Sequence, residues 1–227
     1  MTSGAMDKNG SGAGKRWRTR IKICGLMNID DAKLMNEAEP DFCGVVFAKT
    51  RHFVDDLQAL YIRDSLNEDI PLVGVFVNEP LHHVVELVNN DIIQMVQLHG
   101  DEDELYIEQL RLQVDVPLIR GIRAKSRDDI IKADKLDVEY LLSDTYVKGV
   151  LGGSGVTMDE SLIPEKLSHP LFIAGGLNAG NLEERIRKFR PYSVDLSSSV
   201  EEGDHKSREK TLEVMEIIKN ICLEREK

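Results

Sequence analysis

Eight short apolar runs recur along the chain at intervals of 21 to 30 residues, and this rhythm limits the possible folds more than any other feature. The runs start near Ile21, Phe42, Leu72, Ile93, Pro117, Tyr140, Pro170 and Tyr192. Each interval leaves room for a strand, a helix of about 10 to 14 residues and two loops, which is the βα repeat of parallel sheets. Helical spacing of apolar residues is clear in four of the intervening or following segments, at 28–38, 81–88, 181–189 and 206–222.

The runs are apolar on both faces, as in Leu-Phe-Ile-Ala at 171–174. Strands of this kind belong to a sheet that helices cover. Eight βα units predict a single closed (β/α)8 TIM barrel over residues 20–227. A doubly wound open sheet is the alternative, but it usually has fewer strands and a glycine-rich turn after the first one, whereas residues 24–26 read Cys-Gly-Leu. The barrel is therefore the favoured fold.

The ends of the barrel and the overall composition set the expected environment. Residues 1–19, with Gly-Ser-Gly-Ala-Gly and a basic cluster, predict a disordered tail or a remnant of cloning, because they lack the apolar core of a signal peptide. The net charge of -11 argues against a nucleic-acid partner, and the longest apolar runs are too short to cross a membrane. The three cysteines cannot all pair, which favours reduced thiols and a cytoplasmic protein.

A TIM barrel also predicts where the active site lies, because catalytic residues in this fold follow the C-terminal ends of the strands. The residues at those positions are Cys24, Thr50, Arg51, His52, Asn78, Gln97, His99, Arg120, Arg123, Asp144, Gly175, Gly176, Asp195 and Ser197 to Ser199.

Small residues cluster after the last three strands, as they do in barrels that bind a phosphate. They are Gly152, Gly153, Gly175, Gly176, Ser197, Ser198 and Ser199. Glycines let backbone N–H groups approach an anion, and a short helix start after the serines would add further donors. Each patch alone could be an ordinary turn. Three patches at adjacent strand ends predict a phosphorylated small-molecule substrate.

A phosphorylated substrate without a metal cluster suggests proton-transfer chemistry that needs no cofactor and no metal, with one group to take a proton and one to give it. Cys24 and Asp144 are the chosen pair, as base and acid, at opposite sides of the barrel mouth. A buried structural thiol and a helix cap remain the alternatives for these two residues. Gln97 and His99 follow the fourth strand, where His99 could bind substrate or be structural.

The chain also resembles a known enzyme family in seven motifs. They read Lys-Ile-Cys-Gly-Leu at 22–26, Val-Gly-Val-Phe-Val-Asn at 73–78, Gln-Leu-His-Gly at 97–100, Leu-Ser-Asp at 142–144, Gly-Gly-Ser-Gly at 152–155, Ala-Gly-Gly-Leu at 174–177 and Val-Asp-Leu-Ser-Ser-Ser-Val-Glu at 194–201. In this order and at these intervals the set is similar to phosphoribosylanthranilate isomerase of tryptophan biosynthesis.

The resemblance implies an Amadori rearrangement of N-(5'-phosphoribosyl)anthranilate to 1-(2-carboxyphenylamino)-1-deoxyribulose 5-phosphate without a cofactor. It implies that Asp144 protonates the furanose ring oxygen as general acid, and that Cys24 then removes the C2' proton as general base. Other enzymes of the tryptophan pathway are possible partners.

Three departures from the family pattern fall near the substrate. Where the family usually has Ser-Pro-Arg, an aromatic residue and Val, this chain reads Thr-Arg-His-Phe-Val at 50–54, so that either His52 or Arg51 is expected to bind the anthranilate carboxylate. Met-Asp-Glu at 158–160 replaces Phe-Asp-Trp, and Lys206-Ser207 replaces Lys-Asp.

Two other functions compete with this one. The histidine-pathway isomerase catalyses the same rearrangement with two aspartates, and the thiol of Cys24 speaks against it. A catalytically silent phosphate-binding barrel is the second alternative, and the presence of both Cys24 and Asp144 speaks against that one.

Overall fold

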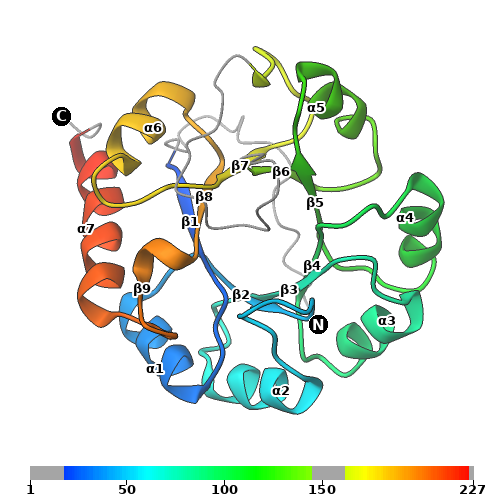
Figure 1. The fold of residues 1–227 in the computed structure, drawn as a ribbon, viewed down its shortest axis with the longest axis horizontal. Coiled ribbons are helices and arrows are strands. Elements are labelled where there is room, and N and C mark those ends of the chain that lie inside the picture. Colours follow the sequence, from blue (N-terminus) through cyan, green and yellow to red (C-terminus); the bar gives the residue numbers. More distant parts are fainter. Residues whose placement is uncertain (1–17, 145–161, 225–227) are drawn as a thin grey trace.

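The structure, a computed structural model, describes residues 18–144 and 162–224 and confirms a closed parallel barrel. Each strand pairs with the next, and β1 closes the ring by pairing with β8. Figure 1 looks down this ring, with the helices placed around it. The barrel strands are β1 (Arg20–Cys24), β2 (Phe42–Val46), β3 (Leu72–Phe76), β4 (Met95–Leu98), β5 (Leu118–Arg123), β6 (Tyr140–Asp144), β7 (Leu171–Ala174) and β8 (Ser193–Leu196).

Helices follow most of the strands and cover the outside of the barrel (Figure 1). They are α1 (Ile29–Ala38), α2 (Asp56–Ser65), α3 (Leu81–Asn89), α4 (Glu104–Arg111), α5 (Arg127–Ala133), α6 (Leu182–Phe189) and α7 (Arg208–Glu224). A 3-10 turn, η2 (Ser198–Val200), and a short hairpin of β9 (Glu201–Glu202) and β10 (His205–Lys206) lie between β8 and α7. Within the described ranges, no helix is both long and apolar enough to cross a membrane.

The eight apolar runs mark the strands to within two residues, and the small differences have local causes. The first helix begins at Ile29 because Asn28 is its cap, whose side chain accepts a hydrogen bond of 2.9 Å from the backbone N–H of Asp31. The last helix begins at Arg208, two residues later than expected, because His205 and Lys206 pair with β9.

Strand alternation divides the apolar side chains into two layers. The larger layer lies between the strands and the helices. The second fills the barrel interior with Phe42, Val73, Met95, Ile119, Tyr140, Leu142, Phe172 and Ala174. Tyr140 and Phe172 meet edge to face there, with ring centroids 5.5 Å apart. The interior is thus a packed core at this level, and the space above it is left for polar groups.

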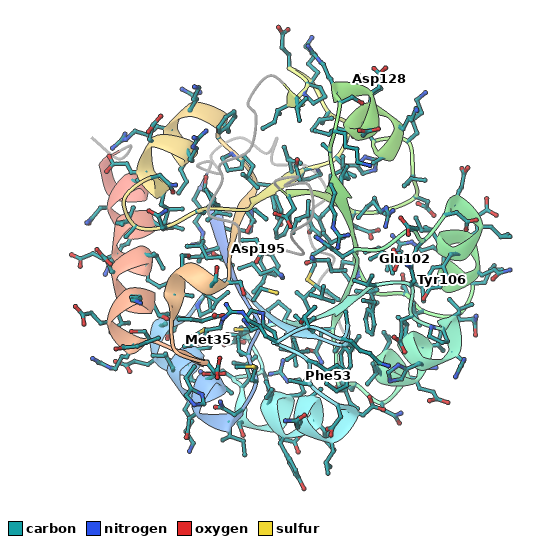
Figure 2. All side chains as sticks on the ribbon, viewed as in Figure 1. Met35, Phe53, Glu102, Tyr106, Asp128 and Asp195 are labelled. Atoms are coloured by element: carbon teal, nitrogen blue, oxygen red, sulfur yellow. The ribbon has the colours of Figure 1, made fainter. Side chains whose placement is uncertain are left out.

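Polar side chains occupy the interior beyond this aromatic layer, at the C-terminal ends of the strands. Figure 2 shows Asp195 inside the ring of strands, whereas Tyr106 and Asp128 lie on the surrounding helices. Cys24, Val46 and Val75 pack together at the same end of the barrel. The C-terminal end of the barrel, where the active site is expected, therefore contains both a thiol and a buried carboxylate.

Candidate active site

A cavity of about 1500 Å³ opens at the C-terminal ends of the strands. Its walls include all the described residues that were assigned a catalytic or substrate-binding role, namely Cys24, Arg51, His52, Gln97, His99, Asp144, Gly175, Gly176, Ser197, Ser198 and Ser199. Gly152 and Gly153, together with the departure at 158–160, lie outside the described residues. The strands thus bring together residues that are up to 175 positions apart in the sequence.

Cys24 ends β1 and projects into the barrel from the same face as Lys22, two residues earlier. The side chain of Lys22 is completely buried. Its Nζ atom lies 3.2 and 3.1 Å from the Oδ1 and Oδ2 atoms of Asp195, which is its register partner on β8. Cys24, Lys22 and Asp195 therefore form a compact group on two adjacent strands.

The electrostatics of this group follow from burial and from the charges within it. Burial raises the pKa of the Cys24 thiol, and the ammonium of Lys22 opposes that rise. Burial acts to lower the pKa of Lys22, but Asp195 and Cys24 outweigh it and leave the pKa raised. Burial also raises the pKa of Asp195, against the effect of Lys22. Within this group, the ammonium of Lys22 is the charge that favours ionisation of the thiol.

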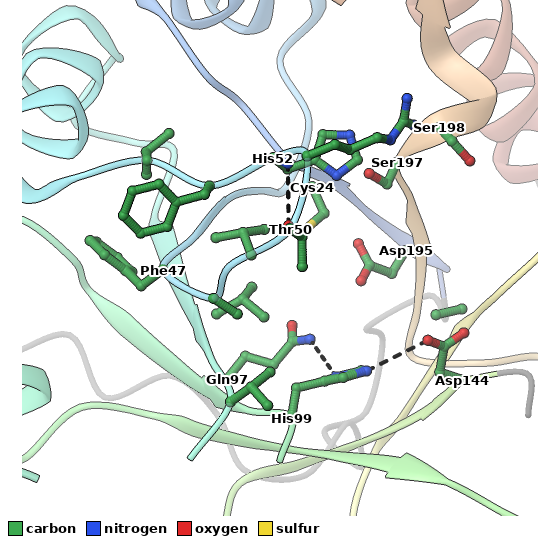
Figure 3. A pocket seen from close by; sticks show the side chains of 18 of the residues that line it. Cys24, Phe47, Thr50, His52, Gln97, His99, Asp144, Asp195, Ser197 and Ser198 are labelled. Atoms are coloured by element: carbon green, nitrogen blue, oxygen red, sulfur yellow. Dashed lines mark hydrogen bonds and ion pairs between the residues drawn. The ribbon is translucent and has the colours of Figure 1, made fainter. Parts of the chain in front are cut away.

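Opposite Cys24, a chain of three polar side chains reaches the end of β6. The Nε2 atom of Gln97 lies 3.1 Å from Nδ1 of His99, and Nε2 of His99 lies 3.5 Å from Oδ2 of Asp144. Since the amide of Gln97 donates to Nδ1, the ring proton of His99 belongs on Nε2 and faces the carboxylate. Figure 3 shows this chain, with Asp195 drawn between Cys24 and Asp144.

Arg51 and His52 both contact the carboxylate of Glu201. Arg51 donates to Oε2, and the Nε2 atom of His52 lies 2.9 Å from Oε1. Lys206 reaches Oε1 as well, at 2.7 Å, and donates to the backbone carbonyl of Cys24 at 2.6 Å. Burial acts to raise the pKa of Glu201, but its contacts with His52 and Lys206 outweigh burial and lower the pKa to about 2. Glu201 is thus an anion that ties the loop after β2 to the segment after β8.

The loops after β7 and β8 form the remaining wall of the cavity. Gly175 and Gly176 have φ angles of 85° and 65°, a conformation that residues with a side chain rarely adopt. The short helix start that was expected at the serines is the 3-10 turn η2, which Ser197 precedes and which contains Ser198 and Ser199. Among the described residues, the buried hydroxyl of Ser199 has no hydrogen-bond partner. This wall thus consists of small residues, and it contains one buried hydroxyl that is not satisfied within the described protein.

Sequence reasoning named two residues that do not line the cavity and gave no site role to two buried residues that contact its walls. Arg120 faces the outer layer because it precedes the inward position of Gly121, and Asn78 lies in a turn with a φ of 55°. Both were expected at the mouth and are absent from the cavity walls. Lys22 and Glu201 were not assigned to the site. The one available signal for Lys22 was a lysine two positions before Cys24 in an apolar strand.

Two further titratable residues have structural surroundings that account for them. Cys43 is fully buried in the outer layer, and burial raises the pKa of its thiol. His83 lies between two carboxylates, with its Nε2 atom 2.8 Å from Asp56 and its Nδ1 atom 2.7 Å from Glu79. Across residues 18–144 and 162–224, no group of three or more His, Cys, Asp or Glu side chains is arranged to hold a metal ion.

Comparison with known sequences gives a consistent result along nearly the whole barrel. Residues 21–217 match the model of the family described as "N-(5'phosphoribosyl)anthranilate (PRA) isomerase". N-(5'-phosphoribosyl)anthranilate isomerase of Endomicrobium trichonymphae is 39% identical over 202 residues, which are 89% of this chain and 99% of that protein. The enzyme of the same name from Pseudomonas syringae pv. tomato is 39% identical over 203 residues, covering 88% of this chain and 97% of that protein.

Solved structures give the same result for the fold. Phosphoribosyl anthranilate isomerase from Thermus thermophilus superimposes with a TM-score of 0.78 at 27% identity and covers 89% of this chain and 100% of that one. A phosphoribosyl anthranilate isomerase in complex with reduced 1-(o-carboxyphenylamino)-1-deoxyribulose 5-phosphate superimposes with a TM-score of 0.72 at 26% identity. That match covers 89% of this chain and 99% of the other.

Proposed function

The chain belongs to the N-(5'-phosphoribosyl)anthranilate isomerase family of tryptophan biosynthesis, and we propose that Cys24 and Asp144 are the base and acid of its reaction. The proposed reaction converts N-(5'-phosphoribosyl)anthranilate to 1-(2-carboxyphenylamino)-1-deoxyribulose 5-phosphate. The observation that carries this assignment is that both side chains line one cavity, at the ends of β1 and β6. A ligand in that cavity can meet both groups.

The proposed mechanism uses one proton donor and one proton acceptor in sequence. Asp144 gives its proton to the furanose ring oxygen, the bond from that oxygen to C1' breaks, and a Schiff base to the anthranilate nitrogen forms. The thiolate of Cys24 then takes the C2' proton, which produces an enolamine that tautomerises to the ketone. His99, whose Nε2 atom is 3.5 Å from Asp144, is suited to orient the acid.

The two ends of the cavity differ in a way that supports one orientation of the substrate. The walls near β2 and β3 carry apolar side chains, including Phe47 and Val75, which suit an aromatic ring. The opposite walls carry the Gly175–Gly176 pair and the serines after β8, which suit a phosphate. The ribose then lies between the two ends, next to Cys24 and Asp144.

We propose Arg51, not His52, as the partner of the anthranilate carboxylate. The side chain of Arg51 is 52% exposed, and a guanidinium that gives one Nη atom to Glu201 still has other donors to offer. His52 is 15% exposed, and the Nε2 atom of its ring already faces Glu201. His52 is therefore suited to hold the loop, and Arg51 to bind the ligand.

The acid and base assignment predicts that Cys24→Ala and Asp144→Asn each reduce kcat by a factor of about 10² or more, because each removes a group that moves a proton in the reaction. The measurement is the decay of phosphoribosylanthranilate fluorescence in a coupled assay with purified protein. Cys43→Ala and Asp30→Asn are the matched controls, since Cys43 faces the outer layer and Asp30 is an exposed residue of α1.

Circular dichroism must show a native fold in all four variants. Full activity of Cys24→Ala or of Asp144→Asn would sink the assignment. If the unmodified protein itself gave no turnover, a barrel that binds phosphate without catalysis would become the better description.

The carboxylate assignment predicts different effects for the two neighbouring residues. We expect Arg51→Ala to raise KM about tenfold or more through loss of a charge-assisted hydrogen bond. His52→Ala should raise KM less, because it affects the loop and not the ligand directly. Steady-state kinetics on both variants decides the matter, and a larger KM for His52→Ala would reverse the assignment.

We also propose that the protein works in the cytoplasm, close to other enzymes of the tryptophan pathway. Free thiols at Cys24 and Cys43 and the acidic net charge support the first point. Cell fractionation followed by the isomerase assay tests it, and activity confined to a membrane or secreted fraction would contradict it. Co-elution with the next pathway enzyme in gel filtration tests the second point, and separate elution would count against it.

A further inference from the structure

A completely buried lysine inside the barrel is the feature that the proposed mechanism leaves unused. Lys22 lies between the apolar residues Ile21 and Ile23 in β1, and its side chain has no exposed surface. Taking an ammonium out of water costs several kcal/mol unless a partner compensates. The carboxylate of Asp195, whose Oδ2 atom lies 3.1 Å from Nζ of Lys22, compensates for this cost. A hydrophobic pair could fill the same space at less cost, so the ion pair calls for a reason beyond packing.

The position of Lys22 relative to the thiol supplies that reason. Gly44 on β2 lies beside both side chains: a Cβ atom added at Gly44 would stand 2.8 Å from Sγ of Cys24 and 3.2 Å from Nζ of Lys22. The ammonium and the sulfur thus converge on one small space, which the missing side chain of Gly44 leaves open.

We propose that Lys22 is the positioning residue that stabilises the thiolate of Cys24, and that Asp195 holds its ammonium in place. The inference rests on the proposed role of Cys24 as base. Lys22 acts through Cys24 and does not itself touch the substrate. Its charge favours the deprotonated sulfur by direct electrostatic attraction inside a site of low dielectric constant.

Of the other charged groups around the thiol, some favour its ionisation and others oppose it. Lys206, which follows β8, donates to the carbonyl oxygen of Cys24 and also favours the thiolate. Asp195 opposes the thiolate directly. On the other side of the cavity, Asp144 acts to raise the pKa of Asp195 and His99 acts to lower it. Lys22 is the strongest of the groups that favour the thiolate, so its removal has the largest expected effect.

The experiment measures the ionisation of Cys24 separately from catalysis. Iodoacetamide reacts with the thiolate and not the thiol, so the rate of Cys24 alkylation against pH, followed by peptide-resolved mass spectrometry, gives the midpoint of its titration. The variants are Lys22→Met, which keeps the length of the side chain, and Lys22→Met/Asp195→Asn, which removes both charges of the pair. Lys33→Met, at an exposed lysine of α1, is the control.

We expect the midpoint for Cys24 to be lowest in the unmodified protein, higher in the double variant and highest in Lys22→Met, where Asp195 stays close to the sulfur without its cation. The shift for Lys22→Met should reach about one pH unit, which is a tenfold loss of thiolate below the midpoint. The acid limb of the isomerase pH–rate profile should move in the same direction in the double variant, with KM nearly unchanged. Lys33→Met should leave both curves in place.

An unchanged midpoint in both Lys22 variants overturns the proposal. If Lys22→Met does not fold, the charge-balanced double variant carries the test alone, and a native circular dichroism spectrum is its precondition. The outcome is separate from that of the proposed function, because alkylation reports the thiol whether or not the protein turns over substrate. Full activity of Cys24→Ala would remove Cys24 as base but leave a shifted midpoint standing.

Discussion

At the scale of single residues, His99 keeps its position because the neighbouring strand leaves room for its ring. A Cβ atom added at Gly121 would stand 2.2 Å from Nδ1 of His99, so alanine cannot occupy that position unless the ring moves. We expect Gly121→Ala to displace His99 from Asp144, to lower kcat about tenfold or more, and to cost about 1 to 3 kcal/mol of stability through overpacking. Isomerase kinetics and urea unfolding measure the two effects.

Gly203→Ala is the matched control for this substitution. An added Cβ at Gly203 meets no atom within 4 Å, although the φ angle of 63° makes alanine slightly strained there. We expect a small loss of stability and no change of kcat. Equal kcat values for the two alanine variants would contradict the role given to Gly121.

Glu201 makes the stability of the protein depend on pH in the acidic range. Burial alone would raise the pKa of its carboxyl, but His52 and Lys206 outweigh burial, so the pKa falls from 4.5 to about 2. A lowered folded-state pKa gives stability that is present above the unfolded pKa and is lost as the pH falls through the folded one. We expect this carboxyl to contribute on the order of 2 kcal/mol, lost between about pH 4.5 and pH 2.

Unfolding by urea at a series of pH values tests this prediction in the unmodified protein and in Glu201→Gln. The variant should be less stable at neutral pH and should lose less stability on acidification. Parallel stability curves for the two proteins would show that Glu201 is not the group responsible.

Residue types and their strand-end positions were enough to predict many of the polar residues in the cavity walls, including Cys24, Asp144 and His99. They could not reveal that Lys22 is paired with Asp195, because that contact depends on the register between the first and last strands, which are 173 positions apart in the sequence. They also could not decide between Arg51 and His52, since a carboxylate 149 residues beyond His52 is the partner that both of them meet.

At the scale of elements, a buried carboxylate braces the turns that follow β3 and β4. Glu102 accepts hydrogen bonds from the backbone N–H groups of Asn78 and Gly100, at 2.7 and 2.9 Å, and from Arg120 at 2.9 Å. Arg120 in turn donates to the carbonyl of Gly100. Glu102 thus joins the ends of β3 and β4 to β5, close to His99, which directly follows β4.

We expect Glu102→Gln to cost about 3 kcal/mol or more of stability, because it leaves the charge of Arg120 partly buried without its counterion. Glu37→Gln is the control, since Glu37 pairs with Arg208 on the exposed surface, where an ion pair contributes little. Urea unfolding of the two variants gives the comparison. Equal losses of stability would show that the buried Glu102–Arg120 pair contributes no more than an exposed ion pair.

Helices and strands followed from the sequence more reliably than their connections did. Apolar runs and caps such as Asn28 act within a few residues, so the local pattern determines them. The β9–β10 hairpin was not expected, because its strands are two residues each and its position depends on Lys206, which hydrogen-bonds to Cys24 far away in the chain. Contacts of that kind are tertiary and leave no periodic signal.

At the scale of the whole molecule, the barrel closes through the strand that begins at Arg20. Thr19 donates its hydroxyl to the carbonyl of Pro191 at 3.1 Å, and the N–H of Ile21 donates to Asp41 at 3.0 Å. Arg18 pairs with Asp41 as well. These contacts join the start of the barrel to β2 and to the segment before β8.

We propose that the barrel does not need residues 1–17, which precede all of these contacts. Deletion of 1–17 should leave the isomerase activity and the urea midpoint unchanged. Deletion of 1–19 should lower the stability by about 1 to 2 kcal/mol, because it removes the hydroxyl of Thr19 and the guanidinium of Arg18. A loss of activity on deleting 1–17 would show that the N-terminal segment has a part in the site.

The contact between Lys206 and the carbonyl of Cys24 has a consequence for the order in which the site is assembled during translation. The thiol is made early in translation, but Asp195 and Lys206, which surround it, are made near the end. A nascent chain that has completed six or seven βα units therefore carries an ordinary cysteine. The contacts of Cys24 with Lys206 and of Lys22 with Asp195 form only when the final unit docks, so the surroundings of the thiol are among the last parts of the barrel to be completed.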